Sequence, residues 1–88
     1  MSTTERPHPD LGRAIKEIRE EAGLTQEQVA DVAGLHWTAI SHIESGRRNP
    51  KYNTLKAVAK GLSVPRWYLM AKEEQIELKR RASYLRGG

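Results

Sequence analysis

The sequence predicts an all-α domain built from five helices. Along most of the chain, apolar side chains recur at the three- and four-residue spacing of one helical face. No segment shows the strict alternation of apolar and polar residues that is typical of a half-buried β-strand. Glycine or proline stands near most boundaries between the periodic segments, where such residues commonly end or begin helices. A chain of 88 residues has the size of a single domain.

The first helix is expected over residues 10–22. Asp10 can cap its N-terminus, and Gly23 can end it in the left-handed conformation. The apolar residues that share one face of this helix are Leu11, Ala14, Ile15, Ile18 and Ala22.

A second helix is expected over residues 26–33, because the sequence before it contains a capping box. Thr25 is followed three residues later by Gln28, so each side chain can bond the backbone N–H of the other residue. Leu24 and Val29 occupy the flanking hydrophobic staple positions. Gly34 is expected to end this helix, since glycine adopts a positive φ at little cost.

A third helix is expected over residues 37–45, directly after the second. Leu35 and Ile40 repeat the staple arrangement, and Gly46 closes the helix. His36 stands at the cap position, and imidazole is not among the oxygen-bearing side chains favoured there. The sequence therefore predicts a poorly capped N-terminus.

The last two helices are expected over residues 52–61 and from residue 66 to about residue 81. Pro65 suits a position in the first turn of the fifth helix, because its fixed φ matches that of a helix. The inward-facing residues expected for the whole domain are Leu11, Ile15, Ile18, Leu24, Val29, Ala33, Ile40, Ile43, Leu55, Val58, Leu62, Val64 and Leu69.

These elements divide the chain into three regions. Residues 1–9, with two prolines and no apolar periodicity, are expected to form a flexible N-terminal arm, and residues 10–70 form the domain. Residues 71–88 form a charged helical extension whose end, at Gly87 and Gly88, is expected to be disordered. The extension is either a surface for a partner or a second copy, or a charged tail that frays.

The charge distribution indicates an anionic partner. Residues 24–45 contain three acidic residues and no Lys or Arg, whereas residues 46–66 contain six Lys or Arg and no acidic residue. A local block of cations in a chain with a sequence pI near 9.7 favours nucleic acid as the partner. A solvated basic face is the alternative on charge alone.

The composition excludes several classes of protein. There are no cysteines, so neither disulfides nor a thiolate zinc site can form. No apolar run approaches the roughly 18 residues that span a membrane, and the first ten residues contain no apolar segment of a secretory signal. We therefore expect a cytoplasmic protein that contacts no membrane.

The second and third predicted helices have the spacing of a helix-turn-helix. A small residue, Ala30, lies where the two helix backbones must approach, and Gly34 provides the turn. Ile40 and Ile43 follow at the apolar positions. In this arrangement the third helix projects from the surface and fits a major groove about 12 Å wide.

The segment LTQEQVADVAGLHWTAISHIESGRRNP closely resembles the Cro/repressor-type, or XRE-like, helix-turn-helix family. The similarity extends through TLKAVAKGLSVPRWYL and covers roughly residues 11–70. The resemblance implies a lambda-repressor-like fold and a double-stranded DNA-binding transcriptional regulator, with repression as the typical role. No cofactor, metal or catalytic residue is implied.

The resemblance also implies a set of contact residues. Those expected to contact bases are Trp37, Thr38, Ser41 and His42, and those expected to contact the DNA backbone are Gln26, Arg47, Arg48, Asn49 and Lys51. Trp37 departs from the family pattern, because an indole only donates and cannot form the paired hydrogen bonds of Arg or Gln to a base. It could pack on a thymine methyl group or a sugar, fold back over its own helix, or contact another subunit.

Glu44 carries a negative charge on the third predicted helix, which is expected to approach the phosphates of DNA. In the family the matching Glu pairs with an Arg of the first helix, and Arg19 stands at that position. We therefore expect a structural ion pair between Arg19 and Glu44.

A homodimer on a near-palindromic operator is expected. One domain buries too little surface to be selective, whereas two domains on half-sites about 34 Å apart contact bases in both half-sites. The predicted interface is the turn between the fourth and fifth helices, with Leu62, Val64, Pro65, Arg66 and Trp67. Burial of Trp67 in its own core is the alternative for that residue.

Two other functions compete with DNA binding at the level of the sequence. The chain could be an antitoxin or an interaction module whose residues 71–86 bind a partner protein. An enzyme is disfavoured, because His36 and His42 are six residues apart and point in different directions on a helix. No phosphate-binding loop or nucleophile motif occurs in the sequence.

Overall fold

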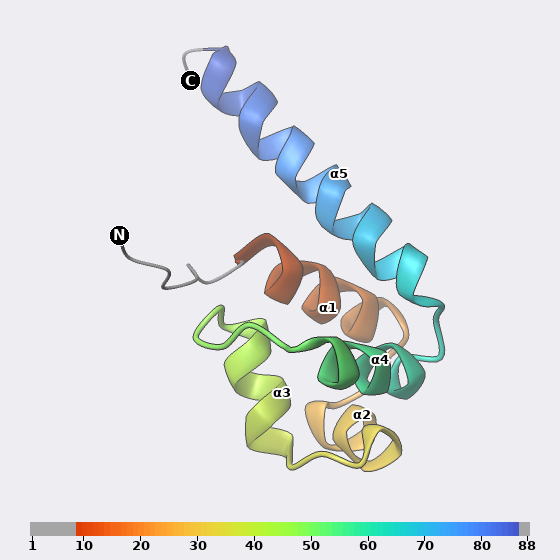
Figure 1. The fold of residues 1–88 in the computed structure, drawn as a ribbon. Helices are drawn as coiled ribbons and strands as arrows, with labels where there is room; N and C mark the ends of the chain where they lie inside the picture. The colour runs from red at the N-terminus through yellow and green to blue at the C-terminus, as the bar shows by residue number, and fades with distance from the viewer. Residues whose placement is uncertain (1–8, 87–88) are drawn as a thin grey trace.

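The structure, a computed structural model, describes residues 9–86. The expected flexibility of residues 1–8 and the expected disorder of Gly87 and Gly88 lie outside the described residues. Within residues 9–86 the chain forms five helices and no strand, so the predicted all-α fold is confirmed (Figure 1). The helices are α1 (Pro9–Glu21), α2 (Gln26–Ala33), α3 (Trp37–Glu44), α4 (Tyr52–Gly61) and α5 (Arg66–Leu85).

The first four helices form a compact unit, and α5 runs along α1 and projects beyond it (Figure 1). Helix α1 packs on α3 and α5, while α2 packs on α3 and α4. None of the described helices is both long and apolar enough to cross a membrane.

The core lies between the inward faces of all five helices. Most of the predicted inward set is buried, and Leu24, Leu55 and Val64 are half-buried against it. Ala33 is the exception, since it is half-buried and lies outside the core cluster. The buried residues are Leu11, Ala14, Ile15, Ile18, Val29, Ala30, Ile40, Ile43, Val58, Ala59, Leu62, Leu69 and Ile76.

Two glycines allow helices to approach more closely than any side chain would permit. A Cβ on Gly12 would lie 2.2 Å from the carbonyl oxygen of Ile43, and one on Gly61 would lie 2.5 Å from that of Val29. Gly12 therefore fixes α1 against the end of α3, and Gly61 fixes α4 against α2. The spacing of apolar residues did not reveal these contacts, because a glycine inside a helix leaves no mark in a hydrophobic pattern.

Several predicted helix ends are corrected by the structure. Helix α1 begins at Pro9, so Asp10 is not its cap but lies in the first turn, where a carboxylate interacts favourably with the helix dipole. Pro65 is the N-cap of α5 rather than a residue of its first turn. Helix α3 ends at Glu44, one residue before the predicted end.

Helix α5 continues to Leu85, about one turn beyond its predicted end. Leu69 and Ile76 are buried against the rest of the domain, and Arg80 bonds Asp10 of α1 with 2.7 Å between Nη2 and Oδ2. These contacts place α5 along α1 as far as Arg80. Ile76 was absent from the predicted core, because the charged residues around it obscure the apolar face.

Candidate nucleic-acid interface

The N-terminus of α2 is capped as the sequence predicts. Thr25 Oγ1 accepts the backbone N–H of Gln28 at 3.0 Å, and the Gln28 side-chain oxygen accepts the N–H of Thr25 at 2.8 Å. Gly34 ends the helix with a φ of 71°. The steep turn that follows places α3 at an angle to α2, with Ala30 buried between them.

The N-terminus of α3 is capped by the imidazole of His36, the residue predicted at this position. Nδ1 of His36 accepts the backbone N–H of Thr38 at 3.3 Å and lies 2.9 Å from Thr38 Oγ1. An unprotonated ring nitrogen thus takes the place of the usual oxygen acceptor. The cap binds the N–H that would otherwise have no acceptor at this helix end.

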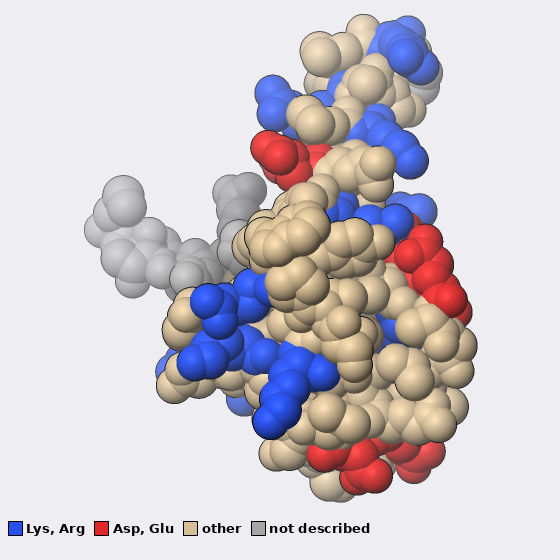
Figure 2. All heavy atoms as spheres, turned by 90° about the vertical axis from the view of Figure 1, so that its right-hand side faces the viewer, with Lys and Arg blue, Asp and Glu red and all other residues tan. Residues whose placement is uncertain are grey.

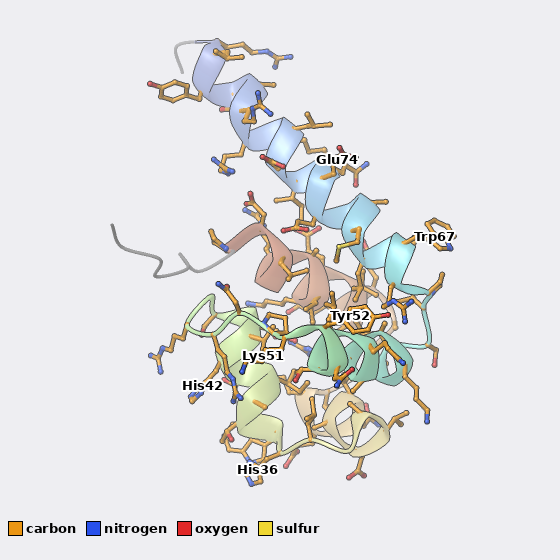
Figure 3. All side chains as sticks on the ribbon, in the orientation of Figure 1. His36, His42, Lys51, Tyr52, Trp67 and Glu74 are labelled. Carbon is orange, nitrogen blue, oxygen red and sulfur yellow. The ribbon has the colours of Figure 1, made fainter. Side chains whose placement is uncertain are left out.

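One side of α3 is open to solvent. His42 is exposed, and Thr38 and Ser41 are half-buried. Figure 3 shows His36 at the N-terminal end of α3, and His42 toward the other end, on the outside of the domain. Because Thr38 and His42 are four residues apart, they lie on one face of the helix. This face presents a hydroxyl group and an imidazole to an incoming ligand.

Trp37 lies beside the N-terminus of α2. Its side chain, 45% exposed, lines a shallow groove together with Arg19 and residues 23–27. The His36 ring lies 5.9 Å from the Trp37 ring, centroid to centroid. Trp37 therefore lies on the groove that includes the start of α2.

The expected pair of Arg19 and Glu44 is present and nearly buried. Nε of Arg19 lies 2.6 Å from one Glu44 oxygen, and Nη2 lies 3.0 Å from the other. The side chains of Arg19 and Glu44 are 12% and 4% exposed. The hydrogen bond to Glu44 raises the pKa of Arg19 above its ordinary value. This pair ties the end of α3 to α1.

Gln26 belongs to the same network. Its Nε2 donates to Glu44 at 3.0 Å, and Arg19 also donates to the carbonyl oxygen of Leu24 at 2.8 Å. The sequence assigned Gln26 to the DNA backbone and missed this bond to Glu44. The amide nitrogen has a second hydrogen, so it can hold Glu44 and still donate outward.

The loop after α3 presents cations. Arg47, Arg48 and Lys51 are exposed, whereas Asn49 is half-buried. The backbone N–H groups of Arg47 and Arg48 both donate to the carbonyl oxygen of His42, at 3.0 and 3.3 Å. These bonds fix the loop to the end of α3. Basic side chains gather on one side of the four-helix unit, and acidic side chains lie on other parts of its surface (Figure 2).

Tyr52 extends this basic surface and was missed by sequence reasoning. It is 60% exposed, with Lys56 Nζ 5.9 Å and Arg66 Cζ 5.2 Å from its ring centroid. Figure 3 places Tyr52 between the start of α4 and the start of α5. The spacing of Tyr52 and Lys56 was a usable signal, since residues four apart are neighbours on a helix.

The residues predicted for a dimer interface differ in how exposed they are. Leu62 is 3% exposed and belongs to the core, so its assignment to a surface is wrong. Val64 is half-buried, while Pro65 and Arg66 are exposed. Trp67 is 69% exposed and meets Tyr68 edge to face, so the alternative of burial in its own core is also wrong.

Comparison with known proteins supports the motif. A sequence profile of the helix-turn-helix family matches residues 15–66. The chain is 40% identical over 68 residues to the HTH-type transcriptional repressor RghR of Bacillus subtilis, covering 76% of this chain and 50% of that protein. It is 39% identical over 67 residues to the immunity repressor protein of Bacillus phage phi105, covering 76% of this chain and 46% of the repressor. The chain thus spans about half the length of these two relatives.

A solved structure matches a larger share of both chains. The wild-type restriction-modification controller protein C.Esp1396I superposes with a TM-score of 0.77 at 35% identity. The match covers 82% of this chain and 94% of the controller protein. The similarity therefore includes part of α5 as well as the helix-turn-helix.

Proposed function

The chain belongs to the Cro/repressor-type (XRE-like) helix-turn-helix family, and we propose that it is a sequence-specific regulator that binds double-stranded DNA. Helix α3 enters the major groove, and the basic loop after it contacts the phosphates. The role is a binding role rather than a catalytic one. Since RghR and the phage phi105 protein are repressors by name, we assign this chain a repressor-type activity in the cytoplasm.

The observation that supports this function best is the position of the cations relative to α3. Arg47 and Arg48 lie on the loop that follows α3. Their backbone N–H groups donate to the carbonyl oxygen of His42, which lies on the exposed face of that helix. Cations at this place bind phosphates on the rim of a groove, which fixes the depth and register of the helix inside it. Bases are then within reach of side chains on the exposed face.

The base contacts are proposed for Trp37, Thr38, Ser41 and His42. His42 can donate to guanine N7 or O6, and the hydroxyl groups can donate or accept. Trp37, beside the start of α2, packs on a sugar or on a thymine methyl group. Backbone contacts are proposed for Gln26, Arg47, Arg48, Asn49 and Lys51, with Tyr52 as an addition suggested by its exposed ring and two nearby cations.

We further propose that the chain acts as a homodimer on a near-palindromic operator. Val64, Pro65, Arg66 and Trp67 remain available for such an interface after Leu62 is removed from it. The exposed indole of Trp67 supports this assignment, because large exposed aromatic residues are enriched at protein interfaces. Binding of a different protein through residues 71–86 is the alternative.

Selection from a pool of random duplexes tests the function directly. The purified chain is expected to enrich one sequence with two inverted half-sites about one helical turn apart. Its affinity for that sequence is expected to exceed its affinity for random DNA by at least about a thousandfold. Equal affinity for selected and random duplexes would contradict sequence-specific binding.

A further inference from the structure

Trp37 is the first residue of α3 and the one large apolar side chain of that helix that the core leaves uncovered. The other two, Ile40 and Ile43, are buried, whereas the indole is 45% exposed. A tryptophan carries a large apolar area, and burial of that area drives binding when a partner covers it. The indole is therefore available to a ligand that approaches α3.

Neighbouring groups hold the indole in place at the surface. It lies on the shallow groove with Arg19 and residues 23–27. The His36 ring lies beside it, with 5.9 Å between the centroids and 31° between the ring planes. His36 is fixed in turn, because its Nδ1 accepts the backbone N–H of Thr38 at 3.3 Å. A side chain supported in this way loses little conformational freedom when it binds.

The position of Trp37 in the helix directs it toward bases. In the proposed complex α3 lies in the major groove, where the N-terminal residues of such a helix contact base edges. Trp37 is at that end, whereas the loop cations proposed for the phosphates follow the other end of α3. Ser41, four residues later, shares a helix face with Trp37. Trp37 and Ser41 therefore form one proposed reading row, beside the row of Thr38 and His42.

The chemistry of indole limits what Trp37 can read in that groove. Indole has one donor and no acceptor, so it cannot form the paired hydrogen bonds that identify guanine or adenine. The one apolar group that the four bases present in the major groove is the C5-methyl group of thymine. Cytosine methylated at C5 presents the same group at the same place. An apolar ring over this group distinguishes a methylated pyrimidine from an unmethylated one.

We propose that Trp37 reads the C5-methyl group of one pyrimidine in each half-site. At that position the protein binds thymine more tightly than uracil, and 5-methylcytosine more tightly than cytosine. This inference rests on the proposed sequence-specific DNA binding and selects the methyl group, rather than a sugar, as the partner of the indole. It makes operator binding sensitive to cytosine methylation at one position of the half-site.

Replacement of thymine by uracil in the selected operator tests the contact, because uracil lacks only the methyl group. One symmetric pair of thymines is replaced at a time. At one position of the half-site, the affinity of the unchanged protein is expected to fall about fifteenfold, or about fourfold for each methyl group no longer buried. Trp37→Ala is expected to bind the thymine and uracil duplexes equally there, so that the two changes are not additive.

Two further variants identify the group that reads the methyl. Trp37→Phe keeps an apolar ring but has no N–H, so it is expected to retain the preference for thymine. Thr38→Ser is the matched control, since it removes the one other methyl group of the proposed base-reading set and keeps the hydroxyl. It is expected to lose as much affinity on uracil replacement as the unchanged protein does. Thermal unfolding of each variant checks that the domain remains folded.

Methylated cytosine provides an independent comparison at the same position. Two duplexes carry a cytosine–guanine pair there, and they differ only in the methyl group at cytosine C5. Their hydrogen-bonding groups are the same, so a difference in affinity reports the methyl group alone. The unchanged protein is expected to bind the methylated duplex about fifteenfold more tightly, and Trp37→Ala is expected to bind both equally.

Two results would overturn the inference while the proposed function stands. One is an operator at which no thymine methyl group matters, or at which the loss caused by uracil is as large in Trp37→Ala as in the unchanged protein. The other is a Trp37→Ala variant that loses the same affinity on thymine and on uracil duplexes, which would place the indole on a sugar. A chain that enriches no sequence from the random pool would overturn the proposed function and the inference together.

Discussion

At the level of single residues, we propose that positioning on DNA and reading of the bases belong to different side chains. Arg47 and Arg48 lie on a loop with no geometry specialised for base edges, so we propose phosphates as their contacts. His42 lies on the exposed face of α3, where base edges are within reach. The two groups are close in the structure, and only their responses to salt and to DNA sequence distinguish them.

The first prediction concerns the loop cations. Arg47→Ala or Arg48→Ala is expected to weaken binding to operator and random DNA alike. Each should reduce the slope of log affinity against log salt by about one unit, because one fewer counterion is released. Titrations of both DNAs at several salt concentrations measure this. A loss confined to the operator would instead make the arginine a base-reading residue.

The second prediction concerns His42. His42→Ala is expected to lower affinity for the operator by about 1 to 3 kcal/mol and to leave random DNA nearly unaffected. The backbone bonds that His42 accepts from the loop are retained in this variant, so the loop stays in place. Equal losses on both DNAs would move His42 to the phosphate contacts.

The third prediction concerns the pair of Arg19 and Glu44. Arg19→Met leaves the Glu44 carboxylate nearly buried without its charged partner, and we expect a loss of about 2 to 4 kcal/mol in the free energy of unfolding. Arg13→Met is the matched control, since Arg13 forms only an exposed pair with Glu17 and should cost less than about 1 kcal/mol. Urea denaturation measures both variants, and similar costs would show that burial of the pair contributes little.

At the level of helices, the sequence predicted the features that depend on residues close together in the chain. The capping box of Thr25 and Gln28 has a short, fixed spacing, and it marked the start of α2 correctly. The ion pair of Arg19 and Glu44 came only from the family resemblance, because its partners are 25 residues apart. His36 was predicted at the cap position of α3 but not as a hydrogen-bonding cap, because propensities describe the average residue and not one ring nitrogen that lies near a backbone N–H.

Other features depend on contacts between helices, so they could not be predicted from the sequence of any single helix. The course of α5 along α1 involves the buried Ile76 and the bond of Arg80 to Asp10. Leu62 was assigned both to the core and to a dimer surface, and an apolar residue near a turn fits either until the packing is known.

The fourth prediction tests the close approach of helices at glycine. Gly12→Ala is expected to destabilise the domain by more than about 2 kcal/mol, because its Cβ meets the backbone carbonyl of Ile43, which cannot move away cheaply. Gly23→Ala is the control, since its φ of 72° is strained for alanine but nothing lies within 4 Å of the added Cβ. It should cost about 1 kcal/mol. Thermal unfolding of the two variants ranks them, and a smaller cost for Gly12→Ala would mean that α1 can shift away from α3.

At the level of the whole molecule, α5 separates two tasks. Its inner face closes the core against α1, while Trp67 and the exposed residues before it remain open for the proposed contact with a second copy. The residues proposed to read bases all lie on α3, and those proposed to contact the DNA backbone lie at the start of α2, on the loop after α3 and at the start of α4. A dimer joined at Trp67 and the residues before it can therefore present two reading surfaces without covering either.

The fifth prediction follows from this arrangement. A dimer holds its two α3 helices at a fixed separation and on the same side of the duplex, so both engage only when the half-sites have matching spacing and phase. Inserting about five base pairs, half a helical turn, between the half-sites turns one of them to the opposite side. Affinity for this operator should then fall to that of a duplex carrying a single half-site, and the dependence of binding on protein concentration should lose its cooperativity. Titration of the three duplexes at one salt concentration measures the effect. If the insertion leaves the affinity of the complete operator unchanged, the two copies bind independently, and a homodimer of fixed geometry is ruled out on DNA even where it forms in free solution.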